Sequence, residues 1–497
     1  MSALVSLRRL GLALCLLSGC FAGSAAAPDD DGVTRLANSG AMDRLAKDTG
    51  VYHKAPKAKT PDFIADPSWP QKLPHHWILG QIGGLAVDSH NHIWVYNRPR
   101  SLTNDEAGLE SAVQGAANKK GVATNGLGFE RPGGPIADCC NAAPSVLEFD
   151  LQGKLLKAWG GPADPGYMQT RCRQDCIWPN SEHGIYVDSH DNVWLAGNSG
   201  KVPNDDAAWI TNAKGGDGFV QKFDRDGNFK MRIGGTPTAP DSNDTNSGVN
   251  GTPTLYMPAD MVIDPATNRL FIADGYGNRR ILIVDADTGR YVGHFGAYGN
   301  NPVDDAAAAA AGRWLPDTLK GNSKPAFFRN PVHCVKIAHD GKIYVCDRGN
   351  DRIQVFDKND PSLGAPCANP AGEAGKCGFV AERFVSEHTE TMPVMPGTAA
   401  SMNFSGDRGQ SCLYVGDNSN QTVYILDRET LQELGRLGSA GRNAGQFHWL
   451  HQVSLDDYGD IYTAEVDSGK RIQKFVHYGA SGCSGSGFST VGGAAEH

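Results

Sequence analysis

The stretch "NPVHCVKIAHDGKIYVCDRGNDRIQVFD", residues 330–357, decides how this chain folds. Apolar and polar residues alternate through "VHCVKIA" and again through "KIYVCD", which is the period-2 pattern of strands with one buried face. The turn between Ala338 and Lys342 joins these two runs into a hairpin, and "RIQVFD" follows as a third run. The stretch therefore predicts consecutive antiparallel strands.

The same pattern occurs six times along the chain. The repeats begin near Gly83, His183, Ala259, His333, Ala400 and His451. Repeats of roughly 40 residues with four short strands are typical of β-propeller blades. We therefore expect an all-β protein: a six-bladed β-propeller of the NHL type with four antiparallel strands in each blade. The segment "HHWILGQIG", residues 75–83, is expected to supply the fourth strand of the last blade and close the ring.

The start of the chain has the pattern of an export signal over residues 1–27. Arg8 and Arg9 precede a short apolar run, and small residues ending at Ala27 follow it. "LSGC" at residues 17–20 also fits a bacterial lipoprotein cleavage box, with Cys20 as a possible lipid anchor, so lipidation and plain cleavage both stay open. We expect an exported protein that is periplasmic, secreted or lipid-anchored in the bacterial envelope.

The composition of the remaining chain indicates its segments and excludes some classes of partner. Residues 28–75 are expected to be a lead-in, residues 76–479 the propeller, and residues 480–497 a Gly/Ser-rich tail. The net charge is −9 and no stretch is strongly basic, which argues against nucleic acid as a partner. After the signal, no segment is long and apolar enough for a transmembrane helix.

Twelve cysteines are present, and export permits disulfides. Cys334 and Cys346 face each other across the hairpin and are expected to pair. Cys367 and Cys377 can close a Pro/Gly-rich loop at 359–377. Four further cysteines are expected to clip two neighbouring loops together, with zinc binding as the less favoured alternative: Cys139, Cys140, Cys172 and Cys176.

The long insertions fall on one end of the expected blades. Turns between first and second strands are short, whereas connections on the other face carry the insertions at 100–144, 159–181, 199–216, 236–257 and 300–329. Long loops on one face of a rigid scaffold commonly build a binding site. We therefore expect a small-molecule site at that end of the propeller axis.

Three histidines occupy one repeated position in every second blade. His183, His333 and His451 each begin a predicted innermost strand, and the matching residues of the other blades are small: Gly83, Ala259 and Ala400. Alternate blades of a six-bladed ring are about 120° apart, so three imidazoles can meet at the axis as facial metal ligands. Zn²⁺ is the first choice for neutral imidazoles, with Cu²⁺, Fe²⁺ and Ni²⁺ as alternatives. A single histidine here would more simply cap its strand.

Three further polar residues end second strands on the same face. Arg98 and Arg348 occupy equivalent positions in their blades, and Tyr276 ends the corresponding strand of the third blade. A guanidinium can orient a carboxylate or stabilise developing negative charge, and a tyrosine beside a metal can act as a base. Taken alone, Arg348 would be read as a solvated or Asp-paired residue.

These residues resemble the peptidyl-α-hydroxyglycine α-amidating lyases, within the wider group of NHL-repeat propellers. The resemblance covers roughly residues 80–478 and is strongest in "MPADMVIDPATNRLFIADGYGNRRILIVD", "NPVHCVKIAHDGKIYVCDRGNDRIQVFD" and "WLHQVSLDDYGDIYTAEV". It implies zinc ligands at His183, His333 and His451. It also implies a catalytic tyrosine at Tyr276 and active-site arginines at Arg98 and Arg348.

Several positions depart from that family. Trp449 stands where the family has methionine, and Gln452 replaces an aspartate that helps to hold a structural calcium, so Ca²⁺ is a doubtful second cofactor. Gly277 occupies a family disulfide position. The insertion at 100–144 rises beside Arg98 and can change the substrate.

The first hypothesis is a zinc-dependent lyase that cleaves a C–N or C–O bond of a small α-hydroxy or carbinolamide-type compound. The second is a zinc hydrolase in which metal-bound water attacks the substrate. The third is a non-catalytic NHL-repeat scaffold that binds a partner in the cell envelope. A calcium-dependent lactonase would need acidic and amide ligands on the axis, which the histidines argue against.

Overall fold

The computed structural model describes residues 52–53, 62–103, 106, 139–164, 166–172, 176–199, 216–302, 325–385 and 397–478. The chain divides into two compact units, Met1–Arg44 and Leu45–His497, and every described residue belongs to the second. The expected signal with Cys20 and the Gly/Ser-rich tail lie outside the described residues. So do large parts of the insertions at 100–144, 199–216 and 300–329.

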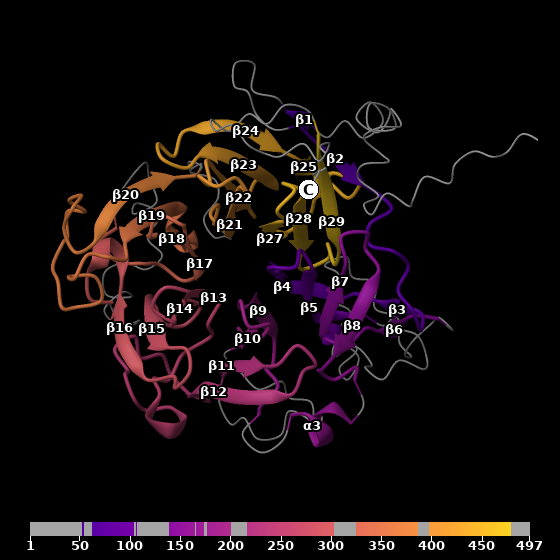
Figure 1. Cartoon of the computed structure of the whole chain (residues 1–497), viewed down its shortest axis with the longest axis horizontal. Coiled ribbons are helices and arrows are strands. Elements are labelled where there is room, and N and C mark those ends of the chain that lie inside the picture. The colour runs from indigo at the N-terminus through magenta and orange to yellow at the C-terminus, as the bar shows by residue number, and fades with distance from the viewer. Residues whose placement is uncertain are drawn as a thin grey trace, which may run out of the picture. The chain divides into compact units, whose positions relative to one another are not determined.

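The second unit is a six-bladed β-propeller, which confirms the fold predicted from the repeats (Figure 1). Each blade is a four-stranded antiparallel sheet that runs from an inner to an outer strand. The first three blades are, in that order, β4 (Gln81–Val87), β5 (Ile93–Arg98), β7 (Val146–Phe149) and β8 (Leu155–Trp159); β9 (Glu182–Val187), β10 (Val193–Gly197), β11 (Gly218–Phe223) and β12 (Phe229–Gly235); β13 (Asp260–Asp264), β14 (Arg269–Asp274), β15 (Arg280–Asp285) and β16 (Tyr291–Phe295).

The next three blades continue around the ring, from orange to yellow in Figure 1. They are β17 (Val332–Ile337), β18 (Lys342–Asp347), β19 (Arg352–Asp357) and β20 (Phe379–Phe384); β21 (Ser401–Phe404), β22 (Cys412–Asp417), β23 (Thr422–Asp427) and β24 (Glu433–Leu437); β27 (Leu450–Leu455), β28 (Ile461–Glu465), β29 (Ile472–Tyr478) and β2 (Asp62–Asp66). The innermost strands contact one another in a closed circle, from β4 through β9, β13, β17, β21 and β27 back to β4.

Small elements decorate the blades. Two parallel pairs join β3 (Trp77–Ile78) to β6 (Asn141–Ala142) and β25 (Ser439–Ala440) to β26 (Gln446–Phe447), and β1 (Tyr52–His53) extends the fifth blade beside β24. The short helical turns are η1 (Pro99–Ser101), α3 (Tyr167–Thr170), η3 (Val249–Gly251), η4 (Ala297–Gly299) and η6 (Arg348–Asn350).

The strand that closes the ring is β2, and the prediction that residues 75–83 close it is wrong. Asp62 to Asp66 pair with β29, the third strand of the last blade, within the segment expected to be a lead-in. Residues 75–83 are used elsewhere, because Trp77–Ile78 pairs with β6 and Gln81 begins the innermost strand of the first blade. Phe63 and Ile64 are buried, so the short "DFIAD" run provides the apolar side chains that the last blade needs.

Aspartates that follow the innermost strands fix the short turns. The Asp88 carboxylate accepts hydrogen bonds from the backbone N–H groups two and four residues later, at 2.9 and 2.8 Å, and from Trp94 Nε1 at 2.9 Å. Asp188 and Asp456 make the same turn contacts in the second and sixth blades. The Asx turn and the aromatic anchor together explain why this part of the repeat is easy to recognise in the sequence.

Buried ion pairs tie the long loops to the blades. Arg280 Nε lies 3.0 Å from Asp274 Oδ2, and Arg352 Nε lies 2.7 Å from Asp347 Oδ2, with all four side chains fully buried. The same guanidiniums donate to loop carbonyls, Arg280 to Thr254 at 2.8 Å and Arg352 to Pro325 at 2.9 Å. Each arginine therefore holds a long connection against its own blade.

Removing one of these arginines is expected to destabilise the protein strongly. Arg352→Ala leaves the Asp347 carboxylate buried without its cation, which costs about 3–5 kcal/mol of unfolding free energy. Arg436→Ala is the matched control, because Arg436 pairs with Glu433 on the surface, where such a pair contributes about 1 kcal/mol or less. Urea unfolding of both variants measures the difference. Equal losses would contradict a structural role for the buried pair.

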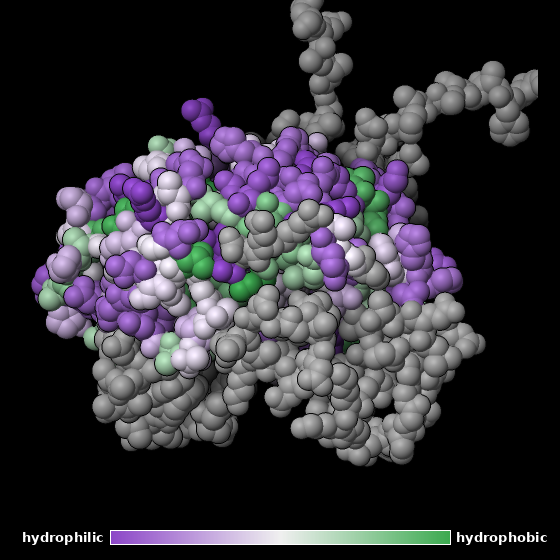
Figure 2. Space-filling model, turned by 90° about the horizontal axis from the view of Figure 1, so that it is seen from below, coloured by the Kyte–Doolittle hydropathy of each residue, from purple (hydrophilic) through white to green (hydrophobic). Residues whose placement is uncertain are grey.

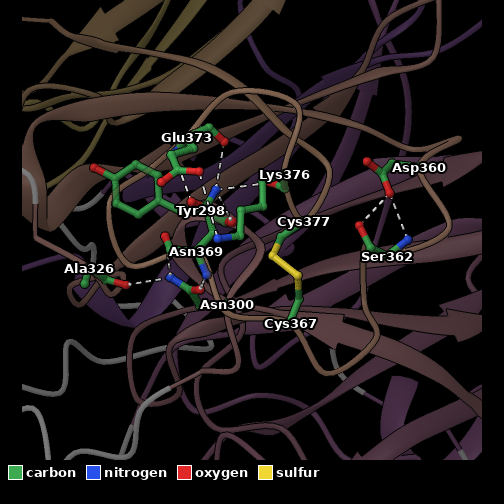
Figure 3. The surroundings of a disulfide bond; sticks show 10 residues. All are labelled: Tyr298, Asn300, Ala326, Asp360, Ser362, Cys367, Asn369, Glu373, Lys376 and Cys377. Carbon is green, nitrogen blue, oxygen red and sulfur yellow. Dashed lines mark hydrogen bonds and ion pairs between the residues drawn. A yellow bond between two sulfur atoms is a disulfide. The ribbon is translucent and has the colours of Figure 1, made fainter.

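Two predicted disulfides are confirmed. Cys334 and Cys346 are partners in the β17–β18 ladder and are bonded. Cys367 and Cys377 close the loop that connects β19 and β20 (Figure 3). Inside that loop, the Asn369 side chain donates to the carbonyls of Glu373 at 2.9 Å and Lys376 at 3.1 Å. The loop is therefore held by both a covalent bond and an amide side chain.

The expectation for the other four cysteines is wrong. Cys139 bonds to its neighbour Cys140, and Cys172 bonds to Cys176, so each pair closes its own segment instead of linking two loops. In each case the bonded partner is at most four residues away along the chain. Several disulfides among the described residues are consistent with an exported protein.

The side of the molecule drawn in Figure 2 is partly covered by grey atoms. Where described residues are visible on it, most are hydrophilic, and hydrophobic residues lie in scattered places. No helix among the described residues has the length and the apolar character that crossing a bilayer requires.

Candidate metal centre

The structure brings His183, His333 and His451 together. Each is the second residue of an innermost strand, in β9, β17 and β27, and each side chain is buried. The three ring centroids form a nearly equilateral triangle with sides of 4.9, 4.8 and 4.9 Å. One nitrogen from each ring lies within 4.8 Å of the others, so the group has the spacing to hold a metal ion.

Backbone carbonyls of the neighbouring blades orient two of the imidazoles. His183 Nδ1 lies 2.8 Å from the Ala259 carbonyl oxygen, and His333 Nδ1 contacts the Ala400 carbonyl oxygen. A carbonyl only accepts, so each Nδ1 carries the proton and each Nε2 carries the free lone pair. Metal-binding histidines commonly have such a partner on the second nitrogen. The sequence revealed Ala259 and Ala400 only as small residues, whereas the structure shows that their carbonyls set the tautomers.

The third imidazole is held differently. His451 Nδ1 is buried and has no hydrogen-bond partner among the described residues. The ring instead packs edge to face against each of the other two imidazoles. The site is therefore symmetric in the placement of its rings but not in their anchoring.

The environment keeps the imidazoles neutral. Burial lowers the pKa of His183 well below its usual range, and the positive charge of Arg98 adds to the effect. Burial also lowers the pKa of His333, with the charge of Arg348 as the next cause. The pKa of His451 is lowered by burial and by the two neighbouring imidazoles. Neutral imidazole is the form that binds a metal.

Tyr276 lies between two of the histidines. Its hydroxyl oxygen is 3.1 Å from His183 Nε2 and 2.9 Å from His333 Nε2, and Arg348 Nη1 donates to it at 3.2 Å. The hydroxyl has one proton, so it can satisfy only one of the two Nε2 lone pairs. The centre therefore has more acceptor lone pairs than protons, and a bound cation would satisfy the remainder. The residues present fit a metal ion on this ground.

The two predicted arginines also lie at this centre. Arg98 ends β5 and donates from Nε to the carbonyl oxygen of Glu182, the residue before His183, at 2.6 Å. Arg348 follows β18, and its Nε is buried without a hydrogen-bond partner in the described part of the chain. Both positive charges lower the pKa of His183. All six residues proposed from the sequence are therefore in one cluster.

A second group of possible ligands lies at the turn end of the first blade. Asp88, His92 and Glu148 have suitable spacing, and His92 Nδ1 is 2.8 Å from Glu148 Oε1. Arg225 already supplies a cation there, because its guanidinium contacts Glu148 and lies 3.7 Å from Asp88 Oδ2. We interpret this group as an ion-pair network.

Comparison with known proteins gives distant relatives. No family model matches the chain. Over 279 residues the chain is 30% identical to peptidyl-glycine alpha-amidating monooxygenase B of Xenopus laevis, which covers 56% of this chain and 23% of that protein. Over 223 residues it is 26% identical to NHL repeat-containing protein 3 of Mus musculus, which covers 44% of this chain and 46% of that protein. The chain thus matches less than half the length of either relative.

Together with the six blades, these matches support an NHL-type propeller. Among solved structures, a streptogramin B lyase overlaps 84% of this chain and 98% of its own, at 10% identity and a TM-score of 0.41. That overlap is too loose to bear on activity. The three-histidine group has the spacing of a metal site.

Proposed function

We propose that this protein is an exported zinc-dependent lyase that acts on small α-hydroxy or carbinolamide-type compounds. The observation that carries the proposal is the convergence of three neutral, inward-facing imidazoles with a tyrosine hydroxyl and two guanidiniums. An NHL scaffold that only binds a partner has no need for this combination. Export is supported by the disulfides between described cysteines.

The proposed metal ligands are His183, His333 and His451. Three neutral imidazoles suit Zn²⁺ and leave coordination positions open. A bound zinc ion would polarise the substrate hydroxyl and make its proton easier to remove. The carbonyls of Ala259 and Ala400 would keep two of the ligands in the metal-binding tautomer.

Tyr276 is proposed as the general base. It takes the proton of the substrate hydroxyl, the hydroxyl carbon forms a C=O bond, and the adjacent C–N bond breaks. The proton then passes to the departing nitrogen, so the products are an aldehyde or glyoxylate and an amide. Water is neither consumed nor released. Arg348 donates to the phenol oxygen and stabilises negative charge there, and Arg98 orients a carboxylate or carbonyl of the substrate.

The test is the reaction itself. Zinc-loaded protein incubated with an N-acyl-α-hydroxyglycine is expected to release glyoxylate and the corresponding amide. Running the reaction in ¹⁸O-water separates the lyase from a zinc hydrolase: attack of water on the acyl carbon would place ¹⁸O in a carboxylic acid product, whereas the lyase leaves the amide oxygen unlabelled. The aldehyde oxygen of glyoxylate exchanges with water and is not used as the readout. Tight zinc binding without turnover of any α-hydroxy amide would refute the lyase proposal. Absence of bound metal would favour the scaffold.

A further inference from the structure

Neutral oxygens hold the Arg98 side chain. Its Nη1 donates to Gln81 Oε1 at 3.0 Å, its Nη2 donates to Asn198 Oδ1 at 3.3 Å, and its Nε donates to the Glu182 carbonyl oxygen at 2.6 Å. Gln81 is the register partner of Arg98 in the β4–β5 ladder, and Asn198 directly follows β10 of the next blade. Three separate elements therefore fix one guanidinium.

This arrangement differs from that of the arginines at or directly before the start of the third strands in three other blades. Arg280 and Arg352 each pair with a buried aspartate, and Arg471 Nε lies 2.6 Å from Glu465 Oε1. In those blades a carboxylate balances the guanidinium charge. Among the described residues, no carboxylate forms an ion pair with Arg98.

The nearest acids are engaged elsewhere. The Glu182 carboxylate accepts hydrogen bonds from Ser145 Oγ at 2.9 Å and Trp178 Nε1 at 3.0 Å. Asp217 accepts backbone N–H groups from the second blade, at 2.8 Å from Asn180 and 2.9 Å from residue 199. Both acids act on Arg98 only through the longer-range electric field.

We propose that Gln81 and Asn198 are positioning residues that hold Arg98 in place while leaving its charge available to an anionic group of the ligand. The inference rests on the proposed function for the identity of the site. A guanidinium has five N–H donors, and the contacts of Arg98 use three of them. Two donors remain for a carboxylate, and part of Arg98 is exposed, so a ligand can reach it.

Two near-isosteric variants separate this role from simple packing. Gln81→Glu keeps the acceptor for Arg98 but adds a competing negative charge. Gln81→Met removes the acceptor and adds no charge. We expect Gln81→Glu to weaken anion binding at least about tenfold and Gln81→Met to weaken it less. A purely structural contact predicts the reverse order, because the glutamate retains the hydrogen bond that methionine loses.

The probes are glycolate and its neutral analogue glycolamide, measured by calorimetry on metal-loaded and on chelator-treated protein. Wild type is expected to prefer glycolate in both states. Gln81→Glu should remove that preference and leave glycolamide binding within about threefold of wild type. Asn198→Asp should also reduce the preference for glycolate over glycolamide. The thermal transition of each variant shows whether it folds, and if one variant does not fold, the other still tests the proposal.

Several results would overturn the inference: an unchanged preference for glycolate in Gln81→Glu, a larger loss in Gln81→Met than in Gln81→Glu, or no preference in wild type. The metal content is measured on the same samples. If wild type binds no zinc, the proposed lyase fails, yet the glycolate preference of the metal-free protein still decides the role of Gln81 and Asn198.

Discussion

His333→Ala is expected to reduce the zinc content of the purified protein from about one ion per chain to near zero. The imidazole of His333 supplies one of three converging nitrogens, and its loss leaves two histidine ligands, His183 and His451. Removing residues that merely orient a ligand commonly costs 10–100-fold in metal affinity, so losing a ligand should cost more than about 100-fold. Elemental analysis after dialysis against a defined zinc concentration measures the effect.

The matched control is His190→Ala, because His190 is an exposed histidine in a turn of the same propeller, where its backbone N–H donates to Asp188. It should retain the metal of wild type. Circular dichroism and the thermal transition show whether His333→Ala still folds, and His333→Gln provides a bulkier replacement. Equal zinc in His333→Ala and wild type would remove the basis for the three-histidine site.

Tyr276→Phe is expected to retain the metal and to lose turnover by about 10²–10⁴-fold, the contribution typical of a positioned general base. The substitution deletes the oxygen that contacts His183 Nε2, His333 Nε2 and Arg348 Nη1, but it leaves the ring and the backbone in place. The loss should therefore be in kcat and not in zinc content. Glyoxylate release from an α-hydroxy amide is the measurement.

Tyr458→Phe is the control for the loss of a phenol, because Tyr458 is 46% exposed in a turn on the last blade. It should have wild-type turnover and zinc content. Full activity in Tyr276→Phe would exclude the phenol as the base. Loss of zinc together with activity would instead make Tyr276 part of the metal site.

The fold could be predicted because each blade repeats the same short-range sequence pattern. Alternating apolar residues form the strands, and an aspartate such as Asp88 or Asp188 fixes the short turn through backbone N–H groups close in sequence. The Cys334–Cys346 bond follows from the register of one hairpin. These interactions are local, so the sequence pattern contains them.

The failures concern the choice of pairing partners, for strands and for cysteines. Both "HHWILGQIG" and "DFIAD" contain apolar residues that suit a strand, and only the pairing of Trp77–Ile78 with β6 shows that the first segment is already used. The Cys139–Cys140 and Cys172–Cys176 bonds could not be chosen over cross-links between the two loops, since sequence spacing does not reveal where loops meet in space.

The candidate site also has a part that the sequence predicts and a part that it does not. The positions of His183, His333 and His451 follow from the repeat, and so do those of Arg98, Arg348 and Tyr276. The groups that orient them come from other blades: carbonyls of Ala259 and Ala400, and the amides of Gln81 and Asn198. A carbonyl has no sequence signal, and an amide acceptor is recognisable only once the adjacent blades are placed together.

The pairing of β2 with β29 has a consequence for biogenesis. The last blade of the propeller joins residues from opposite ends of the described chain, so it cannot form until residue 478 has been synthesised. Most blades can fold from consecutive segments as these are synthesised. The last blade instead requires β2 and β29, which are far apart in sequence, to pair, and such non-local pairing is intrinsically slow. Until then, the apolar side chains of Phe63 and Ile64 stay exposed to solvent. The unpaired strand of the nascent chain is then open to aggregation with other chains.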